Sequence, residues 1–342
     1  MQQIHPIRLE ASLHETIWGG RQLEEANWKE LPPGDVAIGE AWETEISTLA
    51  QNGPYAGQTL GQLVETLGAD LLGADSIAIF GRRFPLLAKF IDANTRLSVQ
   101  VHPNDSYAAE YEHGKLGKTE FWYILATTPG ARIVHGFRAP STRTEVQHAI
   151  EQVHLEELLH EELVAPGDVI FVPAGTVHAI GSGVLLYELQ EYSDVTYRMY
   201  DYGRTDAQGN TRELHIERSL DVSQYEPSAR VKLRAVTLTE NEAYTERCLV
   251  ACRYFVTREL LLRTHFAGST SGSCLILSSL GADLRLYYGE DQQLSEGLTR
   301  GQTMVLPAAL GSYRIEGSGQ LLISYVPGPE DEAWRRWQTA NS

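Results

Sequence analysis

The feature that most constrains the fold of this chain is an internal repeat. The stretches "APGDVIFVPAGTVHAI" and "TRGQTMVLPAALGSYR" align without a gap over residues 165–180 and 299–314. Each runs from a glycine-containing turn through an apolar strand to a Pro-Ala corner and a second strand. A repeat of this kind predicts two related β units on one chain.

Most of the remaining sequence also predicts a mainly β fold. Short apolar runs bounded by Gly, Pro, Asn or Asp are typical of all-β proteins. The clearest predicted strands lie at residues 121–125, 131–136, 168–172, 184–190 and 320–326.

Two stretches have helical spacing instead and predict small helical insertions. Residues 57–73 carry leucines on one helical face, namely Leu60, Leu63, Leu67 and Leu71. Residues 141–163 open with Thr142 and Glu145 at the spacing of a capping box. Val146, Ile150 and Val153 then follow at helical intervals. Trp334 and Trp337 predict a short C-terminal helix, with a frayed end as the alternative.

The repeat also predicts the domain organisation. We expect a catalytic unit with helical insertions at residues 1–225 and a second β unit at residues 226–342, joined through the polar stretch 223–230. Ser312 stands in the second copy where the first copy has His178. Only the first unit is therefore expected to bind a metal through this position.

Composition disfavours several classes of partner. The net charge of −17 over 342 residues disfavours binding to nucleic acid or to an anionic membrane. No apolar run is long enough to span a bilayer, and the first residues lack the pattern of a signal peptide. The odd count of three cysteines favours free thiols, so we predict a cytoplasmic protein. For the oligomeric state, a monomer and a homodimer are both compatible with the sequence.

Four residues of the first unit form a candidate metal site. In "LSVQVHPND", Gln100 and His102 lie two residues apart and leave a strand by the same face. A hairpin through the turn "EHGKLGKT" would return Glu120 beside His102, and His178 follows the Pro-Ala corner. Two imidazoles, one carboxylate and one amide suit a borderline divalent cation, with zinc the best guess. One histidine alone is more often a surface or core residue, so the prediction depends on the spacing of all four.

This spacing resembles that of a cupin barrel, a small double-sheet jelly roll. Four motifs in order make the resemblance more specific, namely "KFIDANTRLSVQVHPND", "GKTEFWYIL", "GDVIFVPAGTVHAI" and "EYSDVTYRMYDYGR". Together they resemble the type I mannose-6-phosphate isomerases in their shorter bacterial form, over about residues 18–204. The resemblance implies two cupin-like jelly-roll units with small helical insertions. It also implies a metal-dependent, typically zinc-dependent, isomerase whose substrate is a phosphosugar, interconverting mannose 6-phosphate and fructose 6-phosphate.

The resemblance also implies roles for eight residues of this chain. The implied metal ligands are His102, Glu120, His178 and, less firmly, Gln100; the implied catalytic residues are Lys118 and Arg198; the implied phosphate-binding residues are Lys89 and Ser98. Lys118 lies two residues from Glu120 and would face the same cavity, where the nearby cation and partial burial would lower its pKa and let it act as a base.

Other interpretations of these residues remain open. Lys118 alone fits a solvated turn lysine, and Arg198 fits a surface ion pair with Asp194 or Asp201. Trp18 fits either the wall of a sugar pocket or the core. Two further functions are also compatible with the motifs: a cupin isomerase of another sugar or phosphosugar, and a non-catalytic sugar-binding cupin.

Overall fold

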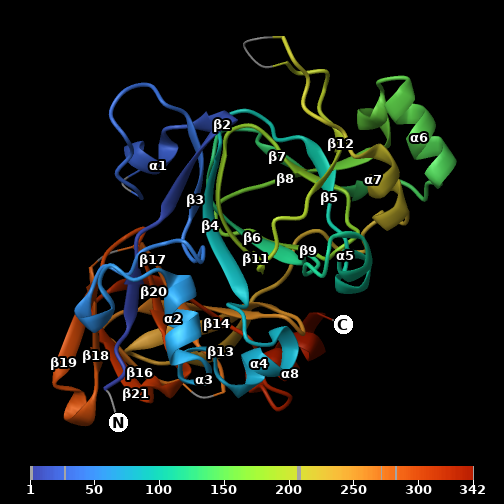
Figure 1. Cartoon of the computed structure of the whole chain (residues 1–342). Coiled ribbons are helices and arrows are strands. Elements are labelled where there is room, and N and C mark those ends of the chain that lie inside the picture. The colour runs from blue at the N-terminus through green and yellow to red at the C-terminus, as the bar shows by residue number, and fades with distance from the viewer. Residues whose placement is uncertain (1–2, 27, 206–208, 271, 282, 342) are drawn as a thin grey trace.

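The first jelly roll is made of two sheets that face each other (Figure 1). The computed structural model describes residues 3–26, 28–205, 209–270, 272–281 and 283–341. The six-stranded sheet has the order β2 (Ser12–Gly20), β3 (Ile38–Trp42), β4 (Leu86–Ala93), β11 (Val184–Glu191), β6 (Glu120–Thr127) and β9 (Val169–Val172). The five-stranded sheet has the order β12 (Tyr197–Tyr200), β5 (Val99–Val101), β10 (His178–Ile180), β7 (Arg132–Phe137) and β8 (Leu159–Leu163). Apolar side chains of both sheets, such as Ile91 and Ile133, meet in one buried cluster between them.

The second jelly roll is built in the same way. Its seven-stranded sheet has the order β1 (Ile7–Leu9), β20 (Thr303–Leu306), β17 (Leu275–Gly281), β22 (Gly319–Tyr325), β15 (Val256–Leu262), β14 (Tyr244–Ala251) and β13 (Val236–Glu240). Its four-stranded sheet has the order β16 (His265–Ser269), β21 (Ser312–Glu316), β18 (Leu284–Tyr288) and β19 (Leu294–Leu298). Through its pairing with β20, the N-terminal strand β1 lies in the sheet of the C-terminal strands.

The two copies of the internal repeat occupy equivalent places in the two jelly rolls. The apolar strands of the copies are β9 and β20, and the strands after the Pro-Ala corners are β10 and β21. In each copy the first strand belongs to one sheet and the second strand to the other. At the first corner Gly175 has a φ of 89°, and a Cβ there would lie 2.9 Å from the Val222 carbonyl oxygen. The prediction of two related β units is confirmed.

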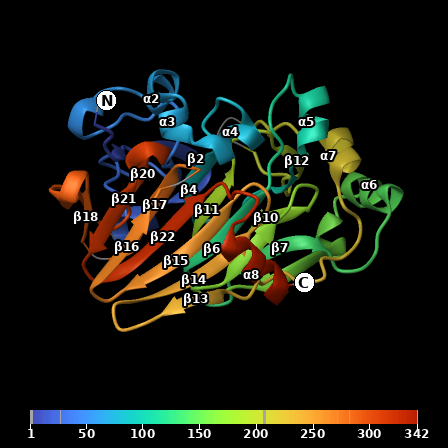
Figure 2. The ribbon, with the colours of Figure 1, turned by 90° about the horizontal axis from the view of Figure 1, so that it is seen from below.

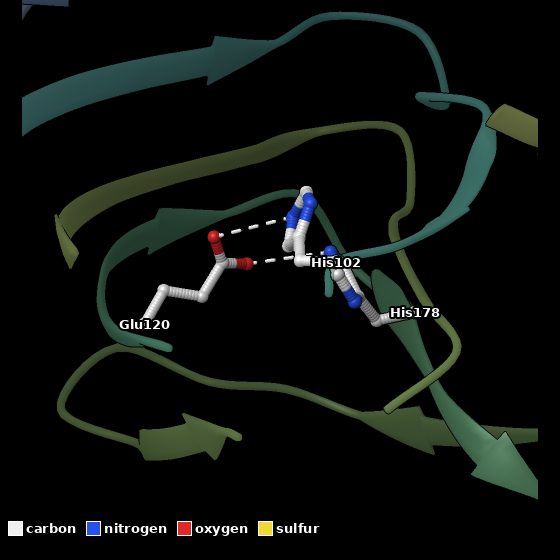
Figure 3. Close-up of side chains that lie close together, drawn as sticks. All are labelled: His102, Glu120 and His178. Carbon is white, nitrogen blue, oxygen red and sulfur yellow. Dashed lines mark ion pairs between the residues drawn. The ribbon is translucent and has the colours of Figure 1, made fainter. Parts of the chain in front are cut away.

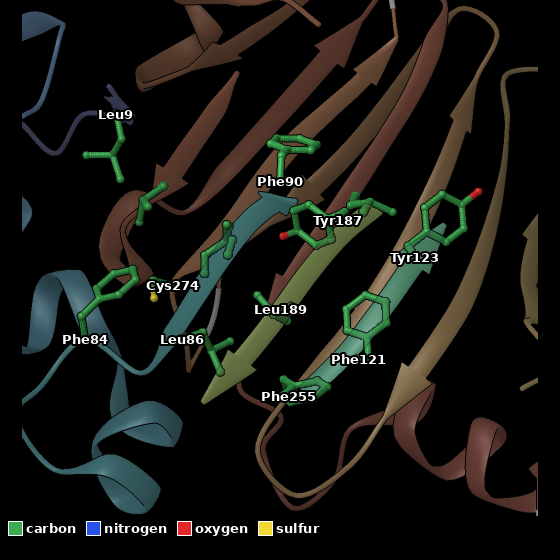
Figure 4. Close-up of a cluster of buried hydrophobic side chains, with 14 of the residues drawn as sticks. Leu9, Phe84, Leu86, Phe90, Phe121, Tyr123, Tyr187, Leu189, Phe255 and Cys274 are labelled. Carbon is green, nitrogen blue, oxygen red and sulfur yellow. The ribbon is translucent and has the colours of Figure 1, made fainter. Parts of the chain in front are cut away.

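An apolar cluster joins the two jelly rolls (Figure 4). Phe121 of β6 and Tyr187 of β11 point away from the first barrel, and the Phe121 ring lies 6.0 Å from that of Phe255 in the second unit. Successive strand residues alternate between faces, so these strands are buried on both sides. Their other face, which includes Glu120 and Glu188, lies inside the first barrel.

Eight α-helices and four 3-10 helices complete the part of the chain that the structure describes. The α-helices are α1 (Gln22–Glu25), α2 (Leu60–Leu67), α3 (Ala69–Leu72), α4 (Ala74–Phe80), α5 (Asp105–Tyr111), α6 (Arg143–Glu151), α7 (Ile216–Val222) and α8 (Glu332–Asn341). The 3-10 helices are η1 (Gly53–Tyr55), η2 (Leu155–Leu158), η3 (Glu290–Gln292) and η4 (Ala308–Leu310). Helices α6 and α7 cover the outer face of the five-stranded sheet, and α8 packs on β13 and β14 (Figure 2). None of the helices formed by the described residues has the length and apolar character of a membrane crossing.

The predicted helices form in part. The first is divided at Gly68, whose φ is 53°, into α2 and α3. The second begins with the predicted capping box at Thr142 but ends at Glu151. A helix continuing to residue 163 is wrong, because Val153 has a φ of 59° and is 64% exposed, and β8 pairs with β7 beyond it. The backbone hydrogen bonds of that edge strand override the helical spacing of its side chains.

The C-terminal helix and the cysteines agree with the sequence predictions. Trp337 of α8 is buried, and its indole N–H donates to the Leu249 carbonyl oxygen over 3.0 Å. The thiols of Cys248, Cys252 and Cys274 are free. Cys248 and Cys274 are fully buried in the apolar cluster between the jelly rolls, as small core residues.

Candidate metal centre and active site

Three side chains from different strands converge inside the first barrel (Figure 3). His102 follows β5, Glu120 begins β6 and His178 begins β10, and all three are fully buried. The two carboxylate oxygens of Glu120 lie 3.5 Å from His102 Nε2 and 3.3 Å from His178 Nε2. Among the described residues, this is the only group of three or more His, Cys, Asp or Glu side chains placed to share one metal ion.

His102 and Glu120 do not meet through a hairpin. Strand β5 lies in the five-stranded sheet and β6 in the six-stranded sheet, so the two side chains face each other across the barrel interior. The predicted hairpin is wrong because the intervening residues form α5, which Asn104 caps with its side chain. After α5, the Lys118 N–H donates to the Pro103 carbonyl oxygen over 3.0 Å, and this hydrogen bond joins the two ends of the connecting segment.

Backbone carbonyls fix the protonation of both imidazoles. His102 Nδ1 lies 3.0 Å from the Val195 carbonyl oxygen, and His178 Nδ1 lies 2.8 Å from that of Thr176. A carbonyl oxygen only accepts hydrogen bonds, so each Nδ1 carries the hydrogen and each Nε2 keeps its lone pair toward Glu120. Burial lowers the pKa of His178 to about 3 and holds the pKa of His102 well below its usual value. Neutral imidazoles oriented in this way are the form that ligates metals.

The polar atoms between these residues are short of hydrogen bonds. Apart from the Lys118 ammonium beside one Glu120 oxygen, His102 Nε2 and both carboxylate oxygens of Glu120 are buried without a hydrogen-bond partner. Burial raises the pKa of Glu120 to about 7 and Glu188 adds to this, while the ammonium of Lys118, 2.8 Å away, opposes it. Buried polar atoms without partners are costly, and a divalent cation would satisfy all three. The residues therefore fit one metal ion.

Gln100 lies at the edge of this group. In the ladders of the five-stranded sheet it stands directly opposite His178 on one side and Arg198 on the other. Its amide nitrogen is 3.2 Å from His178 Nε2 and donates to the same lone pair that a cation would use. Direct ligation requires the amide to turn its oxygen inward, so ligation by Gln100 stays a prediction.

A cavity of about 200 Å³ opens beside the three converging residues. The predicted site residues that line it are Lys89, Ser98, Gln100, Lys118 and Arg198. The structure thus brings the remaining predicted residues together around one space. Trp18 lines the same cavity and is only 6% exposed, so both interpretations of this residue apply.

Lys118 is buried at the inner end of the cavity, which excludes a solvated turn lysine. Burial lowers its pKa, but the carboxylates of Glu120 and Glu188 raise it more, so its pKa lies above the usual value. The lowered pKa expected from the sequence assumes a cation bound beside Lys118 as well as burial, so it stays a prediction for the metal-bound protein.

Lys89 lies on β4 directly opposite Glu188 of β11. Its ammonium is 3.2 Å from a carboxylate oxygen of Glu188 and 3.9 Å from one of Glu40. The Trp42 ring covers it, with the centroid 4.6 Å from Nζ. The positive charge of Lys89 is therefore balanced within the protein.

Arg198, on β12, is half-buried and makes no ion pair with either aspartate named from the sequence. Its Nη1 donates to the Glu213 carbonyl oxygen over 2.9 Å. Asp194 pairs with Lys115 at 2.7 Å, and Asp201 pairs with two other arginines. The surface ion-pair interpretation of Arg198 is therefore wrong.

Sequence reasoning missed several residues of the site. Those that line the cavity are Glu40, Trp42, Glu188 and Arg212, and His135 stands opposite His178 inside the barrel. Glu188 could have been found from the sequence, because it lies at the same two-residue spacing as Val184 and Leu186 and so shares their face of a predicted strand. Arg212 lies in a polar segment without periodicity, which gives no such signal.

Comparisons with known proteins point to one enzyme family. The family model "Phosphomannose isomerase type I, catalytic domain" matches residues 7–122. The mannose-6-phosphate isomerase ManA of Bacillus subtilis is 37% identical over 325 residues, which cover 94% of this chain and 99% of that protein. A mannose-6-phosphate isomerase of Streptococcus mutans is 34% identical over 94% of this chain and 98% of that protein.

Solved structures show the same fold. The crystal structure of mannose 6-phosphate isomerase from Bacillus subtilis matches with a TM-score of 0.83 and 33% identity, covering 93% of this chain and 99% of that one. A mutant of phosphomannose isomerase from Salmonella typhimurium matches with a TM-score of 0.76 at 16% identity, over 94% of this chain and 100% of that one, which shows the fold alone. By its extended similarity to the curated relatives, this chain belongs to the type I phosphomannose isomerase family.

Proposed function

We propose that this protein interconverts mannose 6-phosphate and fructose 6-phosphate with one bound divalent cation, zinc. The observation that carries the proposal is the buried group of His102, Glu120 and His178, whose Nε2 and carboxylate atoms converge beside a cavity that Lys118 also lines. The names of the curated relatives support the same activity.

In this proposal the cation is held by the Nε2 atoms of His102 and His178 and by the carboxylate of Glu120, with Gln100 as a weaker fourth ligand. When bound, the cation polarises the sugar carbonyl and stabilises negative charge on the sugar oxygens. The two backbone carbonyls that accept from the Nδ1 atoms orient the imidazoles for this role.

The reaction moves one proton between C1 and C2. The C2 proton of mannose 6-phosphate leaves, the carbonyl oxygen on C1 gains a proton, and an enediol forms; a proton then returns to C1 as the hydroxyl on C2 becomes the new carbonyl. Lys118 and Glu188 both face the cavity and can exchange a proton with the sugar. We propose Lys118 and Arg198 as the catalytic residues: Lys118 would transfer the proton, and the planar guanidinium of Arg198 would stabilise the negatively charged intermediate or hold the phosphate.

The remaining assignments are proposals of the same kind. Residues 1–225, apart from β1 in the sheet of the second jelly roll, would form the catalytic unit, and residues 226–342 a packing unit that does not bind the metal. Lys89 and Ser98 would contact the sugar phosphate from the cavity wall. The cytoplasmic location and the choice between monomer and homodimer stay predictions.

A coupled assay of the purified protein tests the proposal. Fructose 6-phosphate should be converted to mannose 6-phosphate, a chelator should abolish the conversion, and added zinc should restore it. Unchanged turnover in a protein shown by elemental analysis to be free of metal would rule out the metal-centred proposal. No turnover of either sugar phosphate by the zinc-loaded protein would rule out the activity itself.

Two pairs of variants sharpen the assignment. His102→Ala should lower kcat/KM by more than about 100-fold and reduce the zinc content, whereas the exposed His148→Ala should change neither. Lys118→Met should lose turnover while keeping zinc. Near-normal turnover of Lys118→Met would exclude Lys118 and leave Glu188 as the proton-transfer group.

A further inference from the structure

The lysines that line the active-site cavity have their charges balanced by carboxylates. The ammonium of Lys118 lies 2.8 Å from Glu120, and that of Lys89 lies 3.2 Å from Glu188. Both pairs are buried, so neither lysine offers an uncompensated charge to a ligand. A dianionic phosphate group entering the cavity therefore requires positive charge in addition to that of Lys89.

Three arginines lie at or near the cavity, and two of them share one carboxylate. Arg212 donates from Nε and Nη2 to the two oxygens of Asp201, over 2.8 Å and 2.6 Å. Arg204 donates from Nε to the same carboxylate over 3.1 Å. No carboxylate of a described residue lies within 4.0 Å of the Arg198 guanidinium nitrogens. Within the described part of the chain, these three guanidinium groups have one carboxylate partner, Asp201, so positive charge is locally in excess in a protein whose net charge is −17.

Arg198 and Arg212 line the cavity, and they are close enough to affect each other. Burial lowers the pKa of Arg198, and the neighbouring Arg212 lowers it further. The Nε atom of Arg198 is buried without a hydrogen-bond partner. Two adjacent guanidinium groups and an unpaired buried N–H are unfavourable on their own, and an anion between them would relieve both costs.

The register of the sheet sets the distance from these arginines to the candidate metal group. Arg198, Gln100 and His178 stand opposite one another on three neighbouring strands and leave the sheet by the same face. Strands lie roughly 4.8 Å apart, so Arg198 is about 10 Å from His178 across the cavity. In a hexose 6-phosphate the phosphate likewise lies at the opposite end of the carbon chain from C1 and C2. A sugar whose C1 and C2 lie near the metal group thus directs its phosphate toward the arginines.

We propose that Arg212, together with Arg198, binds the phosphate group of the sugar substrate, and that Asp201 positions Arg212 for this contact. The inference depends on the proposed isomerase function and adds to it a specificity residue that the sequence does not indicate. The planar guanidinium of Arg212 presents paired N–H donors, a geometry that suits phosphate oxygens. Asp201 holds Arg212 through two hydrogen bonds, so less side-chain freedom is lost when the phosphate binds.

Steady-state kinetics of Arg212→Gln test the proposal. The KM for fructose 6-phosphate should rise by about 10- to 100-fold, the worth of hydrogen bonds to a charged group, with kcat changed by less than about two-fold. Weak turnover of phosphate-free fructose, where measurable, should be unaffected. Calorimetric binding of inorganic phosphate should weaken by a similar factor, and Arg212→Lys should recover part of it. An unchanged KM and unchanged phosphate binding in Arg212→Gln would overturn the proposal.

Arg204→Gln is the matched control, because Arg204 also pairs with Asp201 but does not line the cavity. It should raise the KM far less than Arg212→Gln does. An equal rise in both variants would mean that the arginines act only by holding Asp201, which would refute direct contact by Arg212. Lys89→Met tests Lys89 as the main phosphate contact. If Lys89→Met abolishes phosphate binding and Arg212→Gln does not, the arginine site is wrong.

The calorimetric measurement also separates this inference from the proposed function. If the zinc-loaded wild-type protein fails to turn over fructose 6-phosphate but binds inorganic phosphate in an Arg212-dependent way, the isomerase proposal fails and the phosphate site stands. If the protein is an active isomerase whose phosphate binding does not depend on Arg212, the isomerase proposal stands and the phosphate site fails.

Discussion

Replacing Glu191 by Gln should stabilise this protein in a way that depends on pH. Glu191 ends β11, is 1% exposed, and accepts the backbone N–H of Thr119 on one oxygen over 2.8 Å. Its other oxygen is buried without a hydrogen-bond partner in the structure. Burial, and then the neighbouring carboxylate of Asp105, raise the pKa of Glu191 from 4.5 to about 8. The oxygens of Asp105 accept from Tyr254 and Gly117, which keeps that carboxylate in place.

The sign and size of the effect follow from this pKa. Between about pH 4.5 and pH 8 the folded protein keeps a proton on Glu191 that the unfolded chain has released. The folded state therefore binds more protons, so the free energy of unfolding falls as the pH rises, by up to about 1.4 kcal/mol per pH unit. The accumulated cost at pH 7 is on the order of 3 kcal/mol. Gln cannot ionise, keeps an acceptor for Thr119, and offers an amide N–H to Asp105.

Urea unfolding of the wild-type protein and Glu191→Gln, at several values between pH 5 and pH 8, measures this difference. The two proteins should have similar stability near pH 5, and the variant should gain on the wild type steadily up to pH 8. Glu240→Gln, at an exposed position of β13, serves as the control and should track the wild type. A stability difference that does not change with pH would refute the reasoning, because it would show that Glu191 ionises alike in both states.

Two further predictions concern packing and buried hydrogen bonds. Trp337→Ala should lower the free energy of unfolding by about 3–5 kcal/mol, because it removes a buried indole. Trp334 is only partly buried, so Trp334→Ala should lower that free energy clearly less. Equal losses in urea titrations would contradict the docking of α8 by Trp337. Tyr123→Phe should cost about 1.5–3 kcal/mol, since the Tyr123 hydroxyl donates over 2.9 Å to the fully buried carboxylate of Glu259 across the contact between the two units. An unchanged urea midpoint would mean that this hydrogen bond contributes nothing to stability.

The sequence was sufficient to single out the candidate metal group because its polar residues interrupt apolar strands. Gln100 and His102 share a strand face, and His178 follows a corner that recurs in the repeat, so residue type and spacing alone point to ligands. The hairpin that we expected between His102 and Glu120 fails for a different reason. A polar segment of that length is compatible with a turn or with a capped helix, and only the pairing of the flanking strands decides between them.

Local sequence does not specify which side chains from distant strands pair inside the barrel. The pairing of Glu188 with Lys89 depends on the alignment of β11 with β4, two strands separated by most of the first unit. Residues of loops, such as Arg212, lack any periodic pattern that would assign them to a face. Their contribution to the site appears only when the segment after β12 is placed against the barrel.

The register of three neighbouring strands explains why the site lies at one end of the barrel and the apolar core at the other. Along the inner face, Lys89, Glu188 and Trp122 form one row across β4, β11 and β6. The next inner row along these strands is entirely apolar and consists of Ile91, Leu186 and Ile124. A slip of one residue in β11 would move Glu188 to the outer face, against the cluster that joins the two jelly rolls. Burying an unpaired carboxylate there would cost several kcal/mol. The same polar residues that build the site therefore also select the register that assembles it.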